Sequence, residues 1–186
     1  METVSFTRMD QGTKEDYALL ERLCTPHKRQ TLVDNVLGLL GQMRGPMLGF
    51  QIDRYQHSLQ TATRALRDGA DEETVVAALL HDIGDGIAPD NHSELAAAVL
   101  RPYISEQDHW IVKHHGLFQG YYFFHHIGED RNARERYRGH PHFEACASFC
   151  ERWDQTSFDP DYDTMPLSAF EPMVRTVFSR PPRGFA

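Results

Sequence analysis

Apolar residues recur along this chain three and four positions apart, which is the spacing of a helix that buries one face. A stretch at 31–43 and another at 72–81 carry the clearest stripes. Strict alternation of apolar and polar residues, the signature of a half-buried strand, never persists for more than a few residues. The pattern therefore predicts an all-α fold, a compact helical bundle. The stripe residues are Leu32, Val33, Val36, Leu39 and Leu40, then Val75, Val76, Leu79 and Leu80.

Capping and breaking residues set the expected helix bounds. Thr13 and Asp16 form a capping box that opens a helix to about Leu23, and Pro26 lies just beyond it. Stretch 116–139 fits no single element, and 158–166 is expected to be an acidic loop. Neither a repeat nor a linker divides the chain, so residues 1–186 are expected to form one domain. The other expected helices are 31–43, 54–68, 72–81, 91–100, 105–115, 141–155 and 167–178.

Composition excludes several classes of function. The net charge of −8 argues against a surface that binds nucleic acid. The longest apolar run, 75–80, has only six residues, so no membrane span is expected. Residues 1–16 contain no apolar signal segment, and three cysteines are too few for a disulfide framework. We therefore expect a cytoplasmic protein with free thiols.

Histidine is the residue type that stands out in the composition. Of 11 histidines, seven fall between 109 and 142, yet the order of four histidines along the helices, three of them upstream of this group, is more informative. His57 lies on one expected helix, and His81-Asp82 ends the next. His92 opens a third helix and His115 ends a fourth. The seven are His109, His114, His115, His125, His126, His140 and His142.

A metal site explains this order. An isolated His-Asp pair also fits a histidine that caps the last carbonyls of its helix. With Asp154 on a later helix, however, five successive helices each carry a His or Asp candidate. Imidazoles and carboxylates without cysteine favour Fe, Mn, Ni, Co or Zn, and helices that converge on one centre build dinuclear sites.

The order His57, His81-Asp82, Asp154 resembles the H…HD…D signature of the HD-domain metalloenzyme superfamily over about residues 54–155, the expected metal-binding core. With His92 and His115, the pattern is similar to the HD-type mixed-valent di-iron oxygenases that cleave organophosphonates. The resemblance implies one iron held by His57, His81, Asp82 and Asp154. A second would be held by His92 and His115, with Asp82 as the bridge. It also implies that Asp82, His81 and His115 form the catalytic centre of an HD-domain bundle.

Two of these assignments have competitors. His115 competes with His114, and the resemblance favours His115 because the relatives place an aromatic residue shortly after this ligand, as Tyr121 stands here. Asp154 is preferred because it lies on a helix beside Trp153. Its competitors occupy the acidic loop and are Asp159, Asp161 and Asp163.

The resemblance also implies a substrate and partners. O2 would cleave the C–P bond of an α-hydroxylated aminophosphonate that an upstream α-hydroxylase supplies. Asp85 and the aromatic run 121–124 suit a trimethylammonium group. The favoured reaction is therefore (R)-1-hydroxy-2-(trimethylammonio)ethylphosphonate to glycine betaine and phosphate. The expected substrate-binding residues are Asp85, His114, Gln119, Tyr122, His125, His126, His140 and Arg152.

Two features set this chain apart from the primary-amine enzyme of that family. Before the first ligand, that enzyme has a tyrosine and a glutamate, whereas 45–55 has only Tyr55 and no glutamate. Gln119 stands where that enzyme has a phosphonate-binding lysine. The competing interpretation is a metal-dependent phosphohydrolase acting on a small phosphate ester or nucleotide, and a non-catalytic HD domain is a third.

Overall fold

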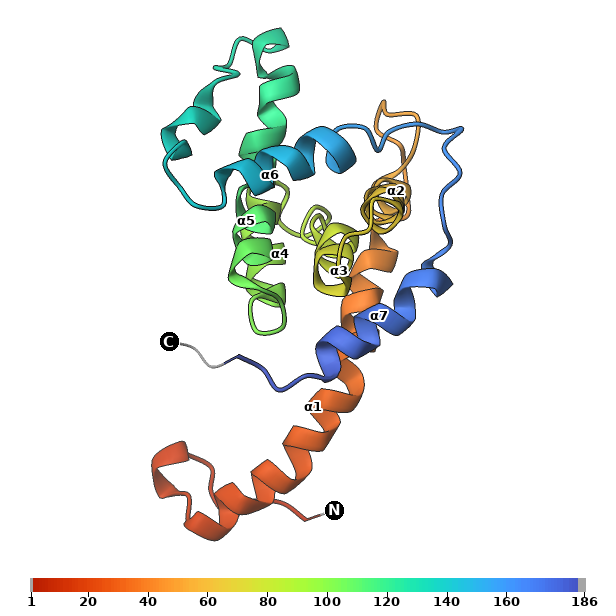
Figure 1. Cartoon of the computed structure of the whole chain (residues 1–186). Coiled ribbons are helices and arrows are strands. Elements are labelled where there is room, and N and C mark those ends of the chain that lie inside the picture. The colour runs from red at the N-terminus through yellow and green to blue at the C-terminus, as the bar shows by residue number, and fades with distance from the viewer. Residues whose placement is uncertain (1, 184–186) are drawn as a thin grey trace. The chain divides into compact units, whose positions relative to one another are not determined.

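The structure, a computed structural model, describes residues 2–183, which form helices and loops without a β-strand. The predicted all-α fold is confirmed (Figure 1). Short 3-10 turns lie at Met9–Gln11, Pro89–Asn91, Phe124–His126 and Ala133–Tyr137. None of the described helices is both long and apolar enough to cross a membrane. The helices are α1 (Lys14–Gln42), α2 (Arg54–Arg67), α3 (Glu72–Leu80), α4 (His92–Leu100), α5 (Glu106–Phe123), α6 (Phe143–Phe149) and α7 (Leu167–Ser179).

By internal contacts the chain divides into two compact units, the first ending at Leu37 and the second beginning at Gly38. In the first unit the predicted capping box is present. Thr13 Oγ1 accepts a hydrogen bond from the Asp16 backbone N–H (3.2 Å), and Asp16 accepts one from the Thr13 N–H (3.0 Å). Backbone N–H groups of Thr13 and Ser5 lower the pKa of Asp16 to about 2. The single domain predicted over 1–186 stays a prediction.

The expected helix end before Pro26 is wrong, because α1 runs through Pro26 without a break. The proline ring fixes φ near a helical value, and the missing N–H removes only one backbone hydrogen bond. The separate helix expected at 31–43 is therefore the second half of α1.

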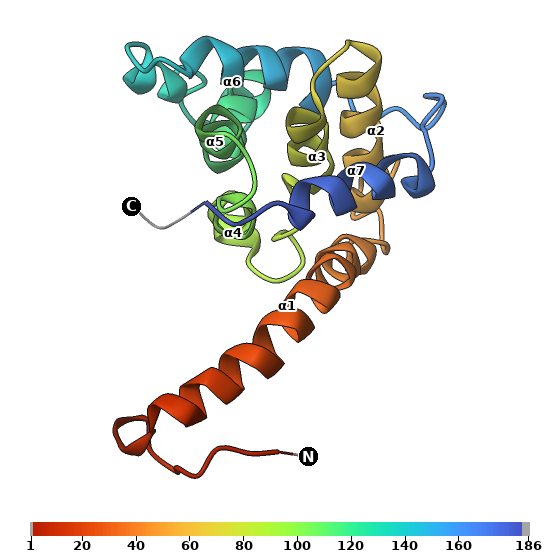
Figure 2. The ribbon, with the colours of Figure 1, turned by 60° about the horizontal axis from the view of Figure 1, so that its bottom comes forward.

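In the second unit, α3 forms the centre, and its residues 75–80 are all buried. Figures 1 and 2 show α2, α5 and α7 around it, in agreement with their contacts. The aspartates before α2 and α3 cap these helices as N-caps commonly do. Asp53 accepts from the Gln56 N–H (2.8 Å), and Asp71 from the Thr74 N–H (2.9 Å). These caps fix where the two helices begin, and so where their inward-facing side chains lie.

Two helix bounds near the centre differ from the prediction. Helix α5 continues past His115 to Phe123, because neither Gly116 nor Gly120 interrupts it. A Cβ at Gly120 would lie 2.4 Å from the Phe124 ring, so this glycine permits close packing. Pro141 precedes α6 rather than starting it, and α6 then widens into a π-helical turn at Cys150–Asp154. Such turns are frequent at functional sites.

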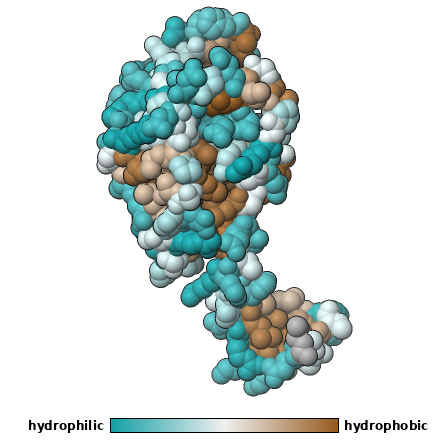
Figure 3. All heavy atoms as spheres, turned by 90° about the vertical axis from the view of Figure 1, so that its right-hand side faces the viewer, coloured by the Kyte–Doolittle hydropathy of each residue, from teal (hydrophilic) through white to brown (hydrophobic). Residues whose placement is uncertain are grey.

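The visible surface is mainly hydrophilic, with apolar atoms gathered in patches on each unit (Figure 3). In the first unit, Met9, Tyr17 and Leu23 are exposed. In the second, exposed apolar residues include Phe50 and Phe123, which are also part of the site described next.

Candidate metal centre

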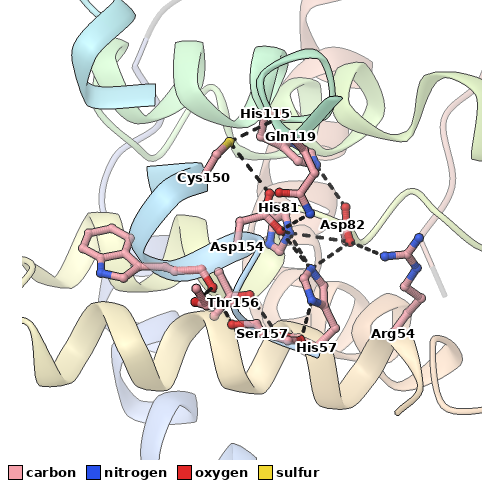
Figure 4. A network of polar contacts seen from close by, with 12 residues as sticks. Arg54, His57, His81, Asp82, His115, Gln119, Cys150, Asp154, Thr156 and Ser157 are labelled. Carbon is pink, nitrogen blue, oxygen red and sulfur yellow. Dashed lines mark hydrogen bonds and ion pairs between the residues drawn. The ribbon is translucent and has the colours of Figure 1, made fainter. Parts of the chain in front are cut away.

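Six side chains from α2, α4, α5, the end of α3 and the π-helical turn converge in the second unit. Figure 4 shows five of them, and His92 completes the set. Five are almost fully buried, and the side chain of His92 is 24% exposed. Two overlapping trios each bring ligand atoms within 4.8 Å of one another. The trios are His57, His81 and Asp154, and His81, Asp82 and His115.

The two oxygens of Asp82 face different pairs of imidazoles. Oδ1 lies 3.3 Å from His92 Nε2 and 3.1 Å from His115 Nε2. Oδ2 lies 3.5 Å from His57 Nε2 and 3.5 Å from His81 Nε2. Asp154 Oδ1 lies 3.1 Å from His57 Nε2 and 3.6 Å from His81 Nε2. One carboxylate thus stands between two clusters of donors.

The backbone fixes which nitrogen of each imidazole faces the centre. His57 Nδ1 donates to Ser157 O (2.8 Å) and His81 Nδ1 to Ala78 O (2.8 Å). His115 Nδ1 donates to Val112 O (2.7 Å), and His92 Nδ1 to Pro89 O (3.1 Å). A carbonyl only accepts, so the proton of each neutral ring is on Nδ1 and the lone pair of Nε2 points inward.

This arrangement fits metal ions. The four inward lone pairs and the carboxylate oxygens are all acceptors, and His57 Nε2 lies only 3.3 Å from His81 Nε2. Acceptors held this close repel one another unless a cation lies between them. Histidines oriented by backbone carbonyls are the usual ligands of such ions. The residues present therefore suit a metal of the Fe, Mn, Ni, Co and Zn group.

The charges at the centre shift the pKa values of its histidines and aspartates in opposite directions. Burial alone would lower the pKa of His57 and His81, but the Asp154 and Asp82 carboxylates raise both above the usual value of 6.5. Burial alone would raise the pKa of Asp82 and Asp154, but the surrounding imidazoles lower both. In the absence of metal, the two carboxylates are therefore charged, and His57 and His81 bind protons more readily than free imidazoles do.

A comparison with protein families identifies this arrangement. The model of the HD domain matches residues 54–156, more than half of the chain. The chain belongs to the HD domain family. Members of this family are generally metal-dependent enzymes, and the matched residues include His81 and Asp82. A search of curated proteins finds no significant match.

The raised pKa values of His57 and His81 predict how the stability of the metal-free HD domain depends on pH. A histidine whose folded pKa is raised stabilises the fold below its unfolded pKa of 6.5, and this contribution is lost as pH rises through the folded value. We expect the metal-free protein to melt at a lower temperature about two pH units above 6.5 than at 6.5.

Circular dichroism melts over this pH range measure the effect. The metal-loaded HD domain is the control, because metal binding requires neutral imidazoles and its stabilisation grows with pH. A metal-free melting temperature that rises steadily above pH 6.5 would contradict the coupling between these histidines and their carboxylates.

Asp154 is held from two sides by groups outside the cluster. Gln119 Nε2 on α5 donates to Asp154 Oδ1 at 2.9 Å. The Cys150 thiol lies 3.9 Å from Asp154 Oδ2 and 3.6 Å from His115 O. Burial raises the pKa of Cys150 well above its usual range, so it remains a thiol that can donate. These contacts orient the Asp154 carboxylate toward His57 and His81 (Figure 4).

Replacing Gln119 with leucine is expected to lower the affinity for metal about tenfold, because partners of this kind orient the ligand carboxylate. Competition with a metal-binding dye measures the loss. Gln155→Leu is the matched control, since Gln155 lines the same cavity but donates to Glu151 O (3.1 Å). Equal affinities in the two variants would show that Gln119 does not orient Asp154.

A cavity of about 480 Å³ opens onto the centre. Asp82, His92, His115 and Asp154 form its floor, whereas His57 and His81 are buried outside its lining. Gly116 and two amides, Gln119 and Gln155, lie beside the floor. Among the lining residues that the structure describes, Arg54 is the only lysine or arginine. Four aromatic side chains form the walls, namely Phe50, Tyr122, Phe123 and Phe158.

Of the residues predicted to bind substrate, the structure places Gln119 and Tyr122 on this cavity and Asp85 beside it. Asp85 Oδ2 lies 3.7 Å from Arg54 Nε, so its charge faces a guanidinium. Arg152 instead extends to Asp68 (2.8 Å) and is not among the residues that line the cavity.

The remaining predicted histidines lie elsewhere. His140 stacks on Trp110 with ring centroids 4.3 Å apart, and His114 packs on the same ring at 4.4 Å. Burial and the nearby Lys113 lower the pKa of His114 to about 4. His125 and His126 lie in an exposed 3-10 turn with their rings 3.9 Å apart. The structure does not bring these four to the cavity of the HD domain.

Sequence reasoning missed several cavity residues. Arg54 precedes His57 by three positions on α2, so helical spacing could have indicated it. Phe158 follows Asp154 by four positions but lies in a loop, and its ring stacks on His57 at 4.4 Å. Phe50 lies in the loop before α2 and stacks on Phe158 at 5.2 Å. No periodicity could have placed these two loop residues.

Proposed function

We propose that this HD domain is a di-iron oxygenase that uses O2 to cleave the C–P bond of an α-hydroxylated aminophosphonate. The favoured substrate is (R)-1-hydroxy-2-(trimethylammonio)ethylphosphonate, which would give glycine betaine and phosphate. The observation that carries the proposal is Asp82, whose two oxygens face two separate pairs of imidazoles. A carboxylate placed in this way suits a bridge between two metals, which a mononuclear hydrolase does not need.

The donor set divides between the two metals. His57, His81, Asp154 and Asp82 Oδ2 would hold one iron, and His92, His115 and Asp82 Oδ1 the other. The iron pair would supply the redox chemistry with O2. The overall reaction balances as R–CHOH–PO₃²⁻ + O2 → R–COO⁻ + HPO₄²⁻ + H⁺. The α-carbon loses four electrons to O2, and its C–H and C–P bonds break.

The chain's other residues would bind and orient the substrate. The Arg54 guanidinium lies 3.8 Å from Asp82 Oδ2 at the edge of the centre, where it can bind phosphonate oxygens. Asp85 and the Phe50 ring, 4.9 Å from the guanidinium carbon, hold Arg54 in place. We therefore assign Asp85 to orienting Arg54 rather than to binding the ammonium group.

The aromatic walls suit the other end of such a substrate. Phe50, Tyr122, Phe123 and Phe158 can surround a trimethylammonium group, which attracts aromatic faces but offers no hydrogen-bond donor. They would also exclude water from the reacting carbon. Gln119 Oε1 is buried and has no hydrogen-bond partner in residues 2–183. We assign it to accept a hydrogen bond from the substrate's α-hydroxyl group.

Arg54→Gln is expected to raise the KM for the phosphonate about tenfold to a hundredfold, because a hydrogen bond to a charged group is lost. Steady-state kinetics with phosphate detection measure the change. Arg152→Gln is the matched control, since Arg152 pairs with Asp68 and should leave KM unchanged. A larger increase in this KM for Arg152→Gln than for Arg54→Gln would show that Arg152, and not Arg54, binds the anion.

The same ligands with Mn, Co or Ni would suit a phosphohydrolase, so the test must separate O2 chemistry from hydrolysis. Protein loaded with iron under anaerobic conditions is mixed with the hydroxyphosphonate and limiting O2. We expect one phosphate released per O2 consumed, and none without O2. Release of phosphate from a phosphate monoester without O2 would replace the proposal with the hydrolase.

The proposed reaction also has a place in a sequence of reactions. An upstream α-hydroxylase must supply the hydroxyphosphonate. We place the activity in the cytoplasm, in keeping with the free thiols of Cys24, Cys146 and Cys150.

A further inference from the structure

A second hollow, of about 660 Å³, has one of the six donor residues, His92, in its lining. It lies between the start of α4 and the middle of α5, and Leu117, His114 and Tyr137 belong to its lining. It shares two lining residues with the substrate cavity, His92 and Gly116. These two residues therefore form the partition between the spaces.

One of the six donor residues, His92, belongs to this partition. The side chain of His92 is 24% exposed, whereas none of the other five exceeds 5%. Gly116 contributes no side chain. A Cβ there would lie 3.1 Å from Ser93 Oγ and 3.9 Å from His92 Nε2, so the space beside the imidazole depends on this glycine.

A reaction that needs a bound organic substrate and O2 raises a problem of access. The aromatic-walled cavity leads onto Asp82, His92 and His115, and a substrate bound there covers these residues from that side. A path from the side of the second hollow would let O2 approach His92 while the substrate is bound. Resting on the proposed oxygenase function, we propose that the second hollow is the O2 route, which opens onto the outer face of His92.

The charged residues that line the hollow carry both signs. Its rim carries Asp90 and Glu94 from one side, and Lys113 and Arg136 from the other. Opposite charges leave no field of one sign to draw in the anionic substrate, which has Arg54 and the aromatic walls in the first cavity. O2 needs no such field. The two openings thus separate the two reactants by their chemistry.

Two variants, one from each space, test the route. Leu117 lines only the second hollow and Phe123 only the substrate cavity. Leu117→Trp is expected to lower kcat/KM for O2 about fivefold or more with the KM for the phosphonate unchanged. Phe123→Ala is expected to raise the KM for the phosphonate and leave kcat/KM for O2 unchanged. A Leu117→Trp variant with normal O2 kinetics would overturn the proposal.

A measurement without turnover separates failure of the route from failure of the proposed function. Dissolved O2 is paramagnetic, so it speeds the relaxation of methyl groups that it approaches. In the zinc-loaded protein under O2 pressure, we expect the Leu117 methyl groups to relax faster than exposed leucine methyls such as those of Leu48. An unchanged melting temperature would show that the Leu117→Trp variant folds normally. Relaxation at Leu117 no faster than at Leu48 would exclude the route, whatever reaction the protein catalyses.

Discussion

Replacing Asp82 with alanine is expected to remove both metals and to lower kcat/KM about 10³-fold or more. The reason is geometric, because each oxygen of this carboxylate faces a different pair of imidazoles at 3.1–3.5 Å. Its loss also leaves His57 and His81 without one of the two carboxylates that raise their pKa values. Metal content by mass spectrometry and steady-state kinetics measure the two effects.

Asp85→Ala is the matched control, three residues further along the same loop. Its carboxylate faces Arg54 rather than the imidazoles, so both metals should remain and only phosphonate binding should weaken. An Asp82→Ala protein that keeps two tightly bound metals would show that Asp82 is not the bridge.

Replacing His92 with alanine is expected to remove one metal and to leave the other in place. His92 Nε2 lies 3.3 Å from Asp82 Oδ1, on the side of His115, whereas His57, His81 and Asp154 gather on the other side. His92 is also the most exposed of the six donor residues, so its loss should leave the core and the fold intact. The metal count should fall from two per chain to one, with activity lost about 10³-fold.

His114→Ala separates this effect from a general loss of imidazole. His114 packs against Trp110 and Tyr137, while its neighbour His115 reaches Asp82 Oδ1 at 3.1 Å. The His114→Ala protein should therefore keep two metals. A His92→Ala protein that still holds two, or a His114→Ala protein that holds one, would require a different assignment of the second metal.

The helical fold was predictable because the apolar stripes and caps act locally. The Thr13 and Asp16 capping box predicted from the sequence is present in the structure. The errors arose where one residue type has two outcomes. Pro26 lies within α1 instead of ending the helix, and Pro141 precedes α6 instead of starting it. The packing of the residues around each proline decides between these outcomes, and this packing cannot be read from the sequence.

The convergence of the six donor residues was predictable from their placement on successive helices. Their common orientation was not, because it depends on carbonyls such as Ser157 O, one hundred positions from its partner His57. The substrate cavity was less accessible to sequence reasoning. Phe50 and Phe158 come from separate loops, and the histidines at 125 and 126 lie in a turn away from the cavity. The ligand roles themselves stay predictions until metal binding is measured.

The central claim is that two irons share Asp82. Mössbauer spectroscopy of protein loaded anaerobically with isotopically enriched iron, together with electron paramagnetic resonance, tests it most directly. We expect two irons per chain in an antiferromagnetically coupled Fe(II)/Fe(III) pair whose signal changes when the hydroxyphosphonate is added. One iron per chain, or two irons without magnetic coupling, would contradict the claim.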